Sequence, residues 1–136
     1  MPSFGQRSRN RIATLRNELR AVLEESIEFT DFTVICGHRN EEAQTLAFDG
    51  GYSTVKWPHS KHNSKISRAV DIAPWHRDKP HIRWKEEREF IFLAGVVMGI
   101  AFRMDVRLRW GGDWDGDFDQ SDQTFMDIGH FEIVDG

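Results

Sequence analysis

The spacing of hydrophobic residues along the chain predicts two helices, and a capping signal predicts a third. From Ser8 to Glu28, apolar residues recur every three or four positions, which predicts one amphipathic helix. A nearly continuous apolar stretch within residues 86–104 predicts a longer helix that is buried in the core. A short helix is expected at 40–48, because Asn40 is a favourable N-cap and two glutamates occupy the turn that follows.

Short apolar or alternating segments predict the strands of a sheet, at residues 32–36, 69–73, 106–110 and 130–134. The polar segments 52–68 and 75–85 predict long loops, and long loops in a small domain are often functional. The chain has 136 residues, which suits one domain, 1–136. The sum is an α+β fold in which a small, mostly antiparallel sheet packs against helices.

Composition excludes several classes of protein. The chain has 18 Lys and Arg against 22 Asp and Glu, so its net charge is −4 and no basic field favours nucleic acid as a partner. The single cysteine, Cys36, cannot form an internal disulfide and is expected to be a buried, inert thiol. The apolar run from Phe90 to Phe102 is shorter than the roughly 20 residues that span a bilayer, so membrane insertion is not expected. The N-terminal segment has no apolar signal core, which predicts synthesis in the cytoplasm without a signal peptide.

An aspartate in an apolar strand is the first candidate for chemistry. Asp71 lies between Val70 and Ile72, and burying an unpaired carboxylate costs several kcal/mol unless a cation or hydrogen-bond donors meet it. His62 lies upstream and His130 lies near the end of the chain. Two histidines and one aspartate can hold a catalytic zinc and leave a fourth position open for water.

Residues near the C-terminus could complete such a site. Alternation in the last strand puts His130 and Glu132 on one face, where Glu132 either supports a metal ligand or is an exposed strand residue. Asp127 precedes His130 by three residues, and a carboxylate beside a zinc-bound water can act as a general base. Spacing alone indicates this site only weakly, because the chain has no short ligand signature of the His-Glu-x-x-His kind.

Four motifs, in this order, resemble those of the zinc peptidases that cut bacterial cell-wall peptides. The segment 36–44 resembles the family's Ser-Gly-Tyr-Arg-Ser-x-x-x-Gln. It is followed by Ser60-x-His62 with Ala69-Val70-Asp71, then by Trp-Gly-Gly-Asp-Trp at 110–114, and last by Asp127-x-x-His130. This family contains D-alanyl-D-alanine carboxypeptidases and dipeptidases and phage L-alanyl-D-glutamate endolysins. The resemblance extends over about residues 9–134.

The resemblance implies a role for each of several residues. It implies one zinc ion per chain, bound by His62, Asp71 and His130. It also implies that Asp127 is the general base and that Arg39 stabilises the oxyanion or the scissile carbonyl, as a fixed cation near developing negative charge would. Substrate contacts are implied for Ser60 and Trp114.

The chain departs from the family pattern between the first two ligands. Asp71 follows His62 by nine positions, where the family has seven, and Ser67 stands where glycine is usual. We expect the extra residues to bulge from the loop without moving the ligands. The expected base is an aspartate, as in the phage branch, where many carboxypeptidases have glutamate.

These expectations predict a zinc peptidase that cleaves the stem peptide of bacterial peptidoglycan. The aspartate base, the short chain and the missing signal peptide favour an L-alanyl-D-glutamate endopeptidase of the endolysin type. Acting on the cell wall from the host cytoplasm would require a holin-type membrane pore. The alternatives are a D-alanyl-D-alanine carboxypeptidase and a non-catalytic zinc-binding module of the same fold. A metal-dependent nuclease is disfavoured by the acidic balance.

Overall fold

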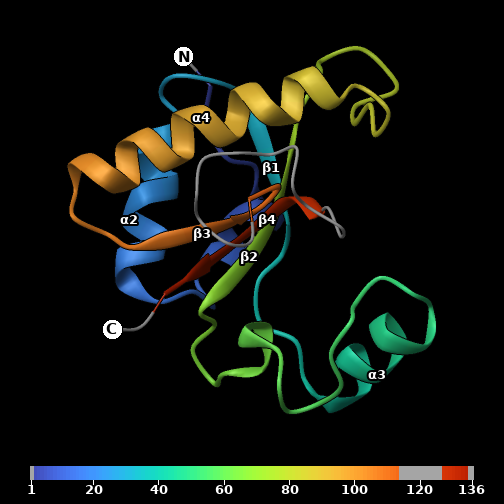
Figure 1. Ribbon diagram of the computed structural model, residues 1–136. Coiled ribbons are helices and arrows are strands. Elements are labelled where there is room, and N and C mark those ends of the chain that lie inside the picture. The colour runs from blue at the N-terminus through green and yellow to red at the C-terminus, as the bar shows by residue number, and fades with distance from the viewer. Residues whose placement is uncertain (1, 114–126, 135–136) are drawn as a thin grey trace.

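The computed structural model describes residues 2–113 and 127–134 (Figure 1). Its helices are α1 (Gln6–Ile12), α2 (Asn17–Ser26), α3 (Glu41–Asp49) and α4 (Glu87–Arg103), with the short 3-10 helix η1 (Lys61–Asn63). Its strands are β1 (Phe32–Cys36), β2 (Ala69–Pro74), β3 (Leu108–Gly111) and β4 (Asp127–Ile133). The predicted α+β fold is confirmed.

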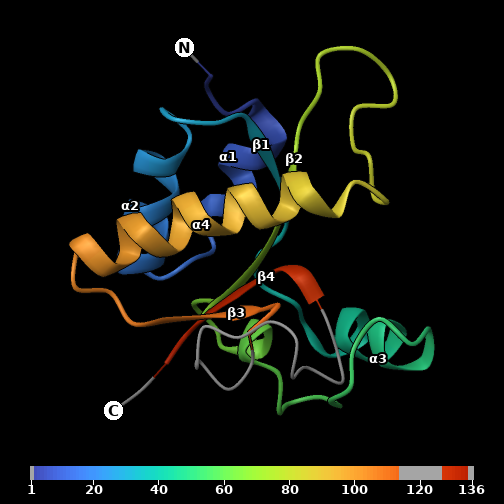
Figure 2. The ribbon, with the colours of Figure 1, turned by 45° about the horizontal axis from the view of Figure 1, so that its top comes forward.

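The four strands form one sheet in the order β1-β2-β4-β3, and every neighbouring pair is antiparallel. The apolar residues Val70 and Ile72 of β2 are fully buried in the core. Asp71, between them, projects to the other face, because side chains alternate along a strand. Helix α4 packs on β2, β3 and β4 and also on α2. The strands lie between α4 and the segment that contains α3 and η1 (Figures 1 and 2).

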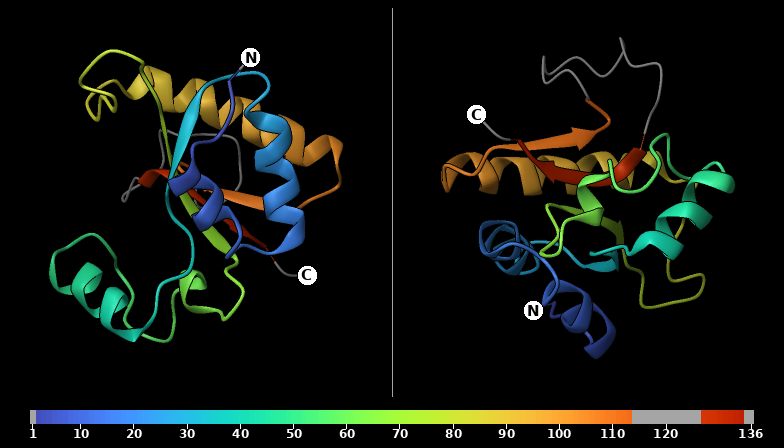
Figure 3. Two further views of the ribbon diagram at one scale, coloured as in Figure 1. Left: turned by 180° about the vertical axis from the view of Figure 1, so that it is seen from behind. Right: turned by 90° about the horizontal axis from the view of Figure 1, so that it is seen from below.

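The predicted helix from 8 to 28 is wrong in one respect, because it is two helices separated by a turn at 13–16. The turn makes backbone hydrogen bonds to the loop before β2. The N–H of Ser67 donates to the carbonyl of Thr14 at 2.8 Å, and the N–H of Arg16 donates to the carbonyl of Ser67 at 3.0 Å. Leu15 and Leu19 are both buried, so the helical spacing of apolar residues continues across the break. For this reason the break cannot be recognised from the hydrophobic pattern. Figure 3 shows both helices on one side of the sheet.

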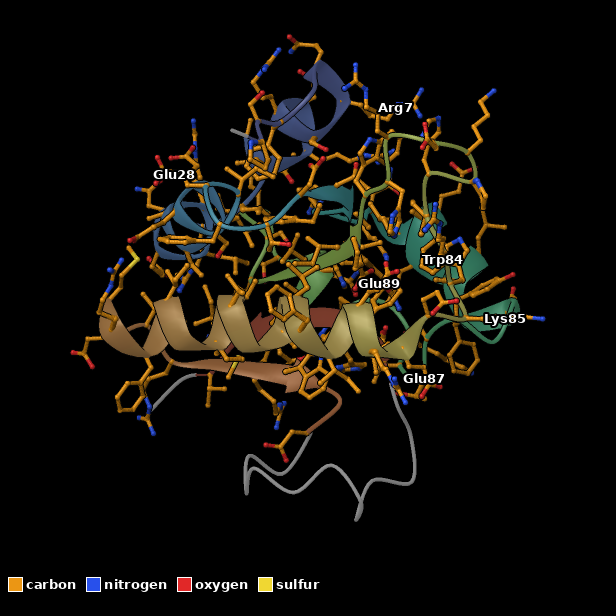
Figure 4. All side chains as sticks on the ribbon, turned by 90° about the horizontal axis from the view of Figure 1, so that it is seen from above. Arg7, Glu28, Trp84, Lys85, Glu87 and Glu89 are labelled. Atoms are coloured by element: carbon orange, nitrogen blue, oxygen red, sulfur yellow. The ribbon has the colours of Figure 1, made fainter. Side chains whose placement is uncertain are left out.

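The other elements lie close to their predicted places. Asn40 caps α3, as expected, by accepting a hydrogen bond from the N–H of Ala43 at 2.9 Å. Strand β4 begins at Asp127, three residues earlier than predicted, so the strand includes the expected base. The loop 75–85 leads into α4, where Trp84 and Lys85 lie at the edge of the molecule (Figure 4). Among the described residues, no helix is long and apolar enough to cross a membrane.

Candidate active site

His62 is held in position by a capped 3-10 turn. The hydroxyl of Ser60 accepts from the N–H of His62 at 3.2 Å, while the N–H of Ser60 donates to the side chain of Asn63 at 3.0 Å. The imidazole is almost completely buried, and its Nδ1 lies 2.6 Å from the carbonyl of Gly37. Because that contact requires a proton on Nδ1, it is Nε2 that would lose its proton and offer a lone pair when a metal ion binds.

Sheet pairing brings Asp71 and His130 to the same place. They are direct partners on β2 and β4, so their side chains share one face. His130 Nδ1 lies 3.0 Å from one carboxylate oxygen of Asp71, and His62 Nε2 lies 3.4 Å from the other. The two imidazole nitrogens are 3.3 Å apart. Ligand atoms around a tetrahedral zinc with bonds of about 2.0–2.1 Å are separated by roughly 3.3 Å, so this cluster has the spacing of a zinc site.

The second nitrogen of His130 is also fixed. Its Nε2 lies 2.8 Å from a carboxylate oxygen of Glu132, which requires a proton on Nε2 and leaves Nδ1 to face Asp71. Arg109 donates to Glu132 at 2.7 Å, and the ammonium of Lys61 lies 3.2 Å from the same carboxylate. Histidine ligands in metal sites usually donate their other N–H to a carboxylate or a carbonyl, and both histidines here do so. The residues therefore fit a metal ion.

Electrostatic interactions keep these side chains charged in spite of burial. Burial would lower the pKa of His62, but the hydrogen bond to Asp71 raises it to about 9. Burial would raise the pKa of Asp71, yet hydrogen bonds from both imidazoles hold it well below its usual range. The pKa of His130 is raised in the same way, against the effect of burial. A divalent cation could bind between these side chains, and it would then replace the protons on the two imidazole nitrogens that face Asp71.

Asp127 lies at the start of β4 and lines the cleft beside the two histidines. Ligand atoms of Asp71, Asp127 and His130 all lie within 4.8 Å of one another. Burial and the negative charge of Asp71 raise the pKa of Asp127 above its usual value. A carboxylate with a raised pKa next to a metal site is suited to accept a proton and to return it later.

Arg39 is fixed by three partners. Its guanidinium donates to Asp71 at 2.8 Å, to the side-chain oxygen of Gln44 at 3.2 Å and to the sulfur of Cys36 at 3.3 Å. The arginine also lines the cleft, with Asp127 and His130. Its positive charge is therefore held beside Asp71 with little freedom to move.

Gln44 is a site residue that received no role from the sequence. It is the only buried residue of α3, and its amide makes every hydrogen bond that it can. The oxygen accepts from Arg39 and from Asn63, at 3.2 and 3.1 Å. The nitrogen donates to the Ser53 hydroxyl at 2.9 Å and to the Val55 carbonyl at 2.8 Å. The sequence did contain a signal for this residue, because Gln44 is the glutamine of the motif at 36–44.

Cys36 differs from its expected state. The thiol is only partly buried, and ligand atoms of Cys36, His62 and Asp71 lie within 4.8 Å of one another. Strand pairing explains this position, because Cys36 is the partner of Asp71 on β1. Although burial raises its pKa, hydrogen bonding to His62 and the charge of Arg39 lower it overall.

The cluster opens into a cleft of about 250 Å³. Ser60 lines this cleft as well as capping η1, so its contact with substrate stays a prediction. Trp114 lies outside the described residues. Of the other histidines, His59 lines the cleft, whereas His76 pairs with Glu89 near the start of α4.

Comparison with known proteins places the chain in a family. The sequence model of the phage L-alanyl-D-glutamate peptidases matches residues 2–134. The chain belongs to this family. The L-alanyl-D-glutamate peptidase of Escherichia phage T5 is 31% identical to it over 138 residues, which cover 96% of this chain and 97% of the relative. The resemblance found in the motifs is thereby confirmed, and the chain is a peptidase.

Solved structures show the same fold. The crystal structure of the Serratia marcescens L-Ala D-Glu endopeptidase ChiX is similar with a TM-score of 0.76 and 20% identity, covering 98% of this chain and 91% of that one. The vancomycin resistance D,D-dipeptidase VanXYg, solved with a D-Ala-D-Ala phosphinate analog, has a TM-score of 0.51 and 18% identity. That match covers 88% of this chain and 50% of VanXYg.

Proposed function

We propose that this peptidase is a zinc-dependent L-alanyl-D-glutamate endopeptidase that cleaves the stem peptide of peptidoglycan. The observation that carries the proposal is the convergence of His62, Asp71 and His130 beside Asp127, in a chain that matches the family over residues 2–134. One zinc ion per chain would be bound by His62 Nε2, the Asp71 carboxylate and His130 Nδ1. Bound there, zinc would supply Lewis-acid polarisation of the scissile carbonyl and a lower pKa for water.

The neighbouring side chains have complementary roles in this proposal. Asp127 accepts a proton from the attacking water and later delivers it to the leaving amine, for which its raised pKa is suitable. Arg39 stabilises the negative charge that develops on the scissile carbonyl oxygen. Because Gln44 and Cys36 hold the guanidinium through two of its nitrogens, Arg39 needs little reorganisation when that charge appears.

A digest of purified peptidoglycan tests the proposal. Released fragments are examined by mass spectrometry, with and without a chelator and after zinc is restored. New N-terminal D-glutamate that disappears with chelator and returns with zinc is the expected result. The Asp127→Ala variant should lose about 100- to 10,000-fold in rate while its zinc content stays at one per chain.

Other results would support the alternatives. Release of D-alanine would identify a D-alanyl-D-alanine carboxypeptidase that uses the same site. An intact wall together with one bound zinc per chain would identify a non-catalytic zinc-binding module. Unchanged activity of Asp127→Ala would remove the assignment of the base. If the protein bound to DNA at physiological salt, a metal-dependent nuclease would again be a candidate function.

The proposed site of action is the bacterial cell wall, reached from the cytoplasm of the host. We propose that a holin-type pore gives the peptidase access to the wall. Lysis from within should then require co-expression of such a pore, whereas purified protein added to isolated walls should not need it.

A further inference from the structure

Beyond the residues that already have a role in the proposed mechanism, and Ser60, the lining of the cleft contains two groups of different chemistry. One group carries ion pairs, in which Glu132 contacts Lys61 and Arg109. The other group consists of residues 52–55 together with His59, and it is called the neutral wall below. The neutral wall offers hydroxyl groups, the methyl groups of Val55 and the ring of Tyr52, but contains no Lys, Arg, Asp or Glu.

The neutral wall is held firmly in place. The buried amide of Gln44 donates to Ser53 and to Val55, as described above. The backbone N–H groups of Tyr52 and Ser53 both donate to the carbonyl of Ala47 on α3, at 2.8 and 3.1 Å. The same Gln44 holds Arg39 through its oxygen, so the neutral wall and the reacting centre share one anchor. A wall that is fixed in this way is preorganised for a ligand.

Tyr52 is an exposed aromatic residue in the lining of the cleft. The residue is 79% exposed although it lines the cavity. Single exposed aromatic residues are ordinary on protein surfaces, and Phe102 on α4 is 86% exposed. What distinguishes Tyr52 is that it lines the same cleft as His62 and His130, on a backbone held by hydrogen bonds.

The chemistry of peptidoglycan places a sugar close to the bond between L-alanine and D-glutamate. The amino group of L-alanine is linked through a lactyl group to a sugar of the glycan strand. The bond between L-alanine and D-glutamate therefore lies one residue from that sugar. Since one residue spans about 3.8 Å, the sugar lies within roughly 10 Å of the reacting carbonyl. On the other side of the bond, D-glutamate carries a free carboxylate, which suits the cations Lys61 and Arg109.

We propose that the neutral wall is a sugar-binding subsite, in which the ring of Tyr52 packs against the glycan sugar that carries the L-alanine. This inference rests on the proposed function. The D-glutamate then lies toward Lys61 and Arg109, and the substrate has one direction across the cleft. The peptidase is accordingly selective for stem peptides that are still attached to the glycan strand.

Two soluble substrates test the subsite: a disaccharide-linked stem peptide and the same stem peptide without the sugars. The wild-type zinc enzyme should have the higher kcat/KM on the disaccharide-linked substrate. The ratio of the two kcat/KM values should fall roughly 2- to 10-fold in Tyr52→Ala, because a ring contact contributes about that much to binding. Tyr52→Phe, which keeps the ring, should preserve the ratio. Phe102→Ala removes an equally exposed ring away from the cleft and should leave both values unchanged.

Each contrary outcome has a distinct meaning. Equal kcat/KM values for the two substrates in the wild type would overturn the subsite. If the ratio of the two kcat/KM values in Tyr52→Ala equals that of the wild type, the role of Tyr52 is overturned. This includes the case in which both kcat/KM values fall by the same factor. Failure of the wild type to cleave either substrate would instead contradict the proposed endopeptidase activity.

Discussion

Glu132 provides the sharpest test of the metal site, because it contacts no substrate in the proposed mechanism. Replacing it by glutamine should weaken zinc binding about 10- to 100-fold, which is typical when the partner of a metal-bound histidine is changed. The carboxylate lies 2.8 Å from His130 Nε2 and so fixes Nδ1 as the nitrogen that would bind the proposed zinc. Glutamine has the same size but no charge, so it polarises the imidazole less and makes Nδ1 a weaker ligand.

The hydrogen bonds of Glu132 also stabilise the folded protein in the absence of metal. Burial would raise the pKa of Glu132, but hydrogen bonds from His130 and Arg109 lower it to about 2 from an ordinary 4.5. That difference corresponds to about 3 kcal/mol. Because the pKa is lowered on folding, this stabilisation is present above pH 4.5 and is lost as the pH falls toward 2. The metal-free Glu132→Gln variant should therefore be less stable than the wild type at pH 7, and the difference should shrink through that range.

Zinc affinity is measured by competition with a chromophoric chelator, and stability by thermal unfolding of the metal-free protein. Glu24→Gln is the matched control, since Glu24 pairs with Arg20 at 2.8 Å but is 52% exposed and belongs to α2. This control should change neither measurement appreciably, because exposed ion pairs contribute little. If Glu132→Gln held zinc as tightly as the wild type, His130 would not be a ligand in the arrangement proposed here.

Two further substitutions test how the site is supported. Gln44→Met should lower kcat with zinc content unchanged, because Arg39 loses a partner that fixes its guanidinium; an unchanged kcat would show that Arg39 is held without it. Gly129→Ala should lower the melting temperature and the zinc content, because an added Cβ would lie 2.5 Å from the carbonyl oxygen of Ile72. Gly95→Ala on α4 is its control, since a Cβ there meets nothing within 4 Å and alanine favours a helix by up to about 1 kcal/mol.

The sequence predicts most of the fold because hydrophobic periodicity reports burial directly. The strands and the core helix at 86–104 were found in this way. The cluster of His62, Asp71 and His130 was predicted from the order of motifs, and strand pairing accounts for part of it. Alternation in the last strand offered Glu132 as a support for His130, but the cations that hold Glu132 were not predictable, because their positions depend on register. Arg109 reaches Glu132 only because the two residues are partners on β3 and β4.

The break in the N-terminal helix and the segment between His62 and Asp71 are joined by backbone hydrogen bonds. The turn at 13–16 exposes a backbone carbonyl and an N–H that a continuous helix would use internally, and Ser67 bonds to both. Ser67 belongs to the segment that carries the two extra residues, so that segment is anchored on the helix break, away from the metal cluster. Asp71 can then pair with His130 in the register that brings their side chains together. Because a loop can absorb added length wherever a partner for its backbone exists, the order of the motifs constrains this site more strongly than their exact spacing.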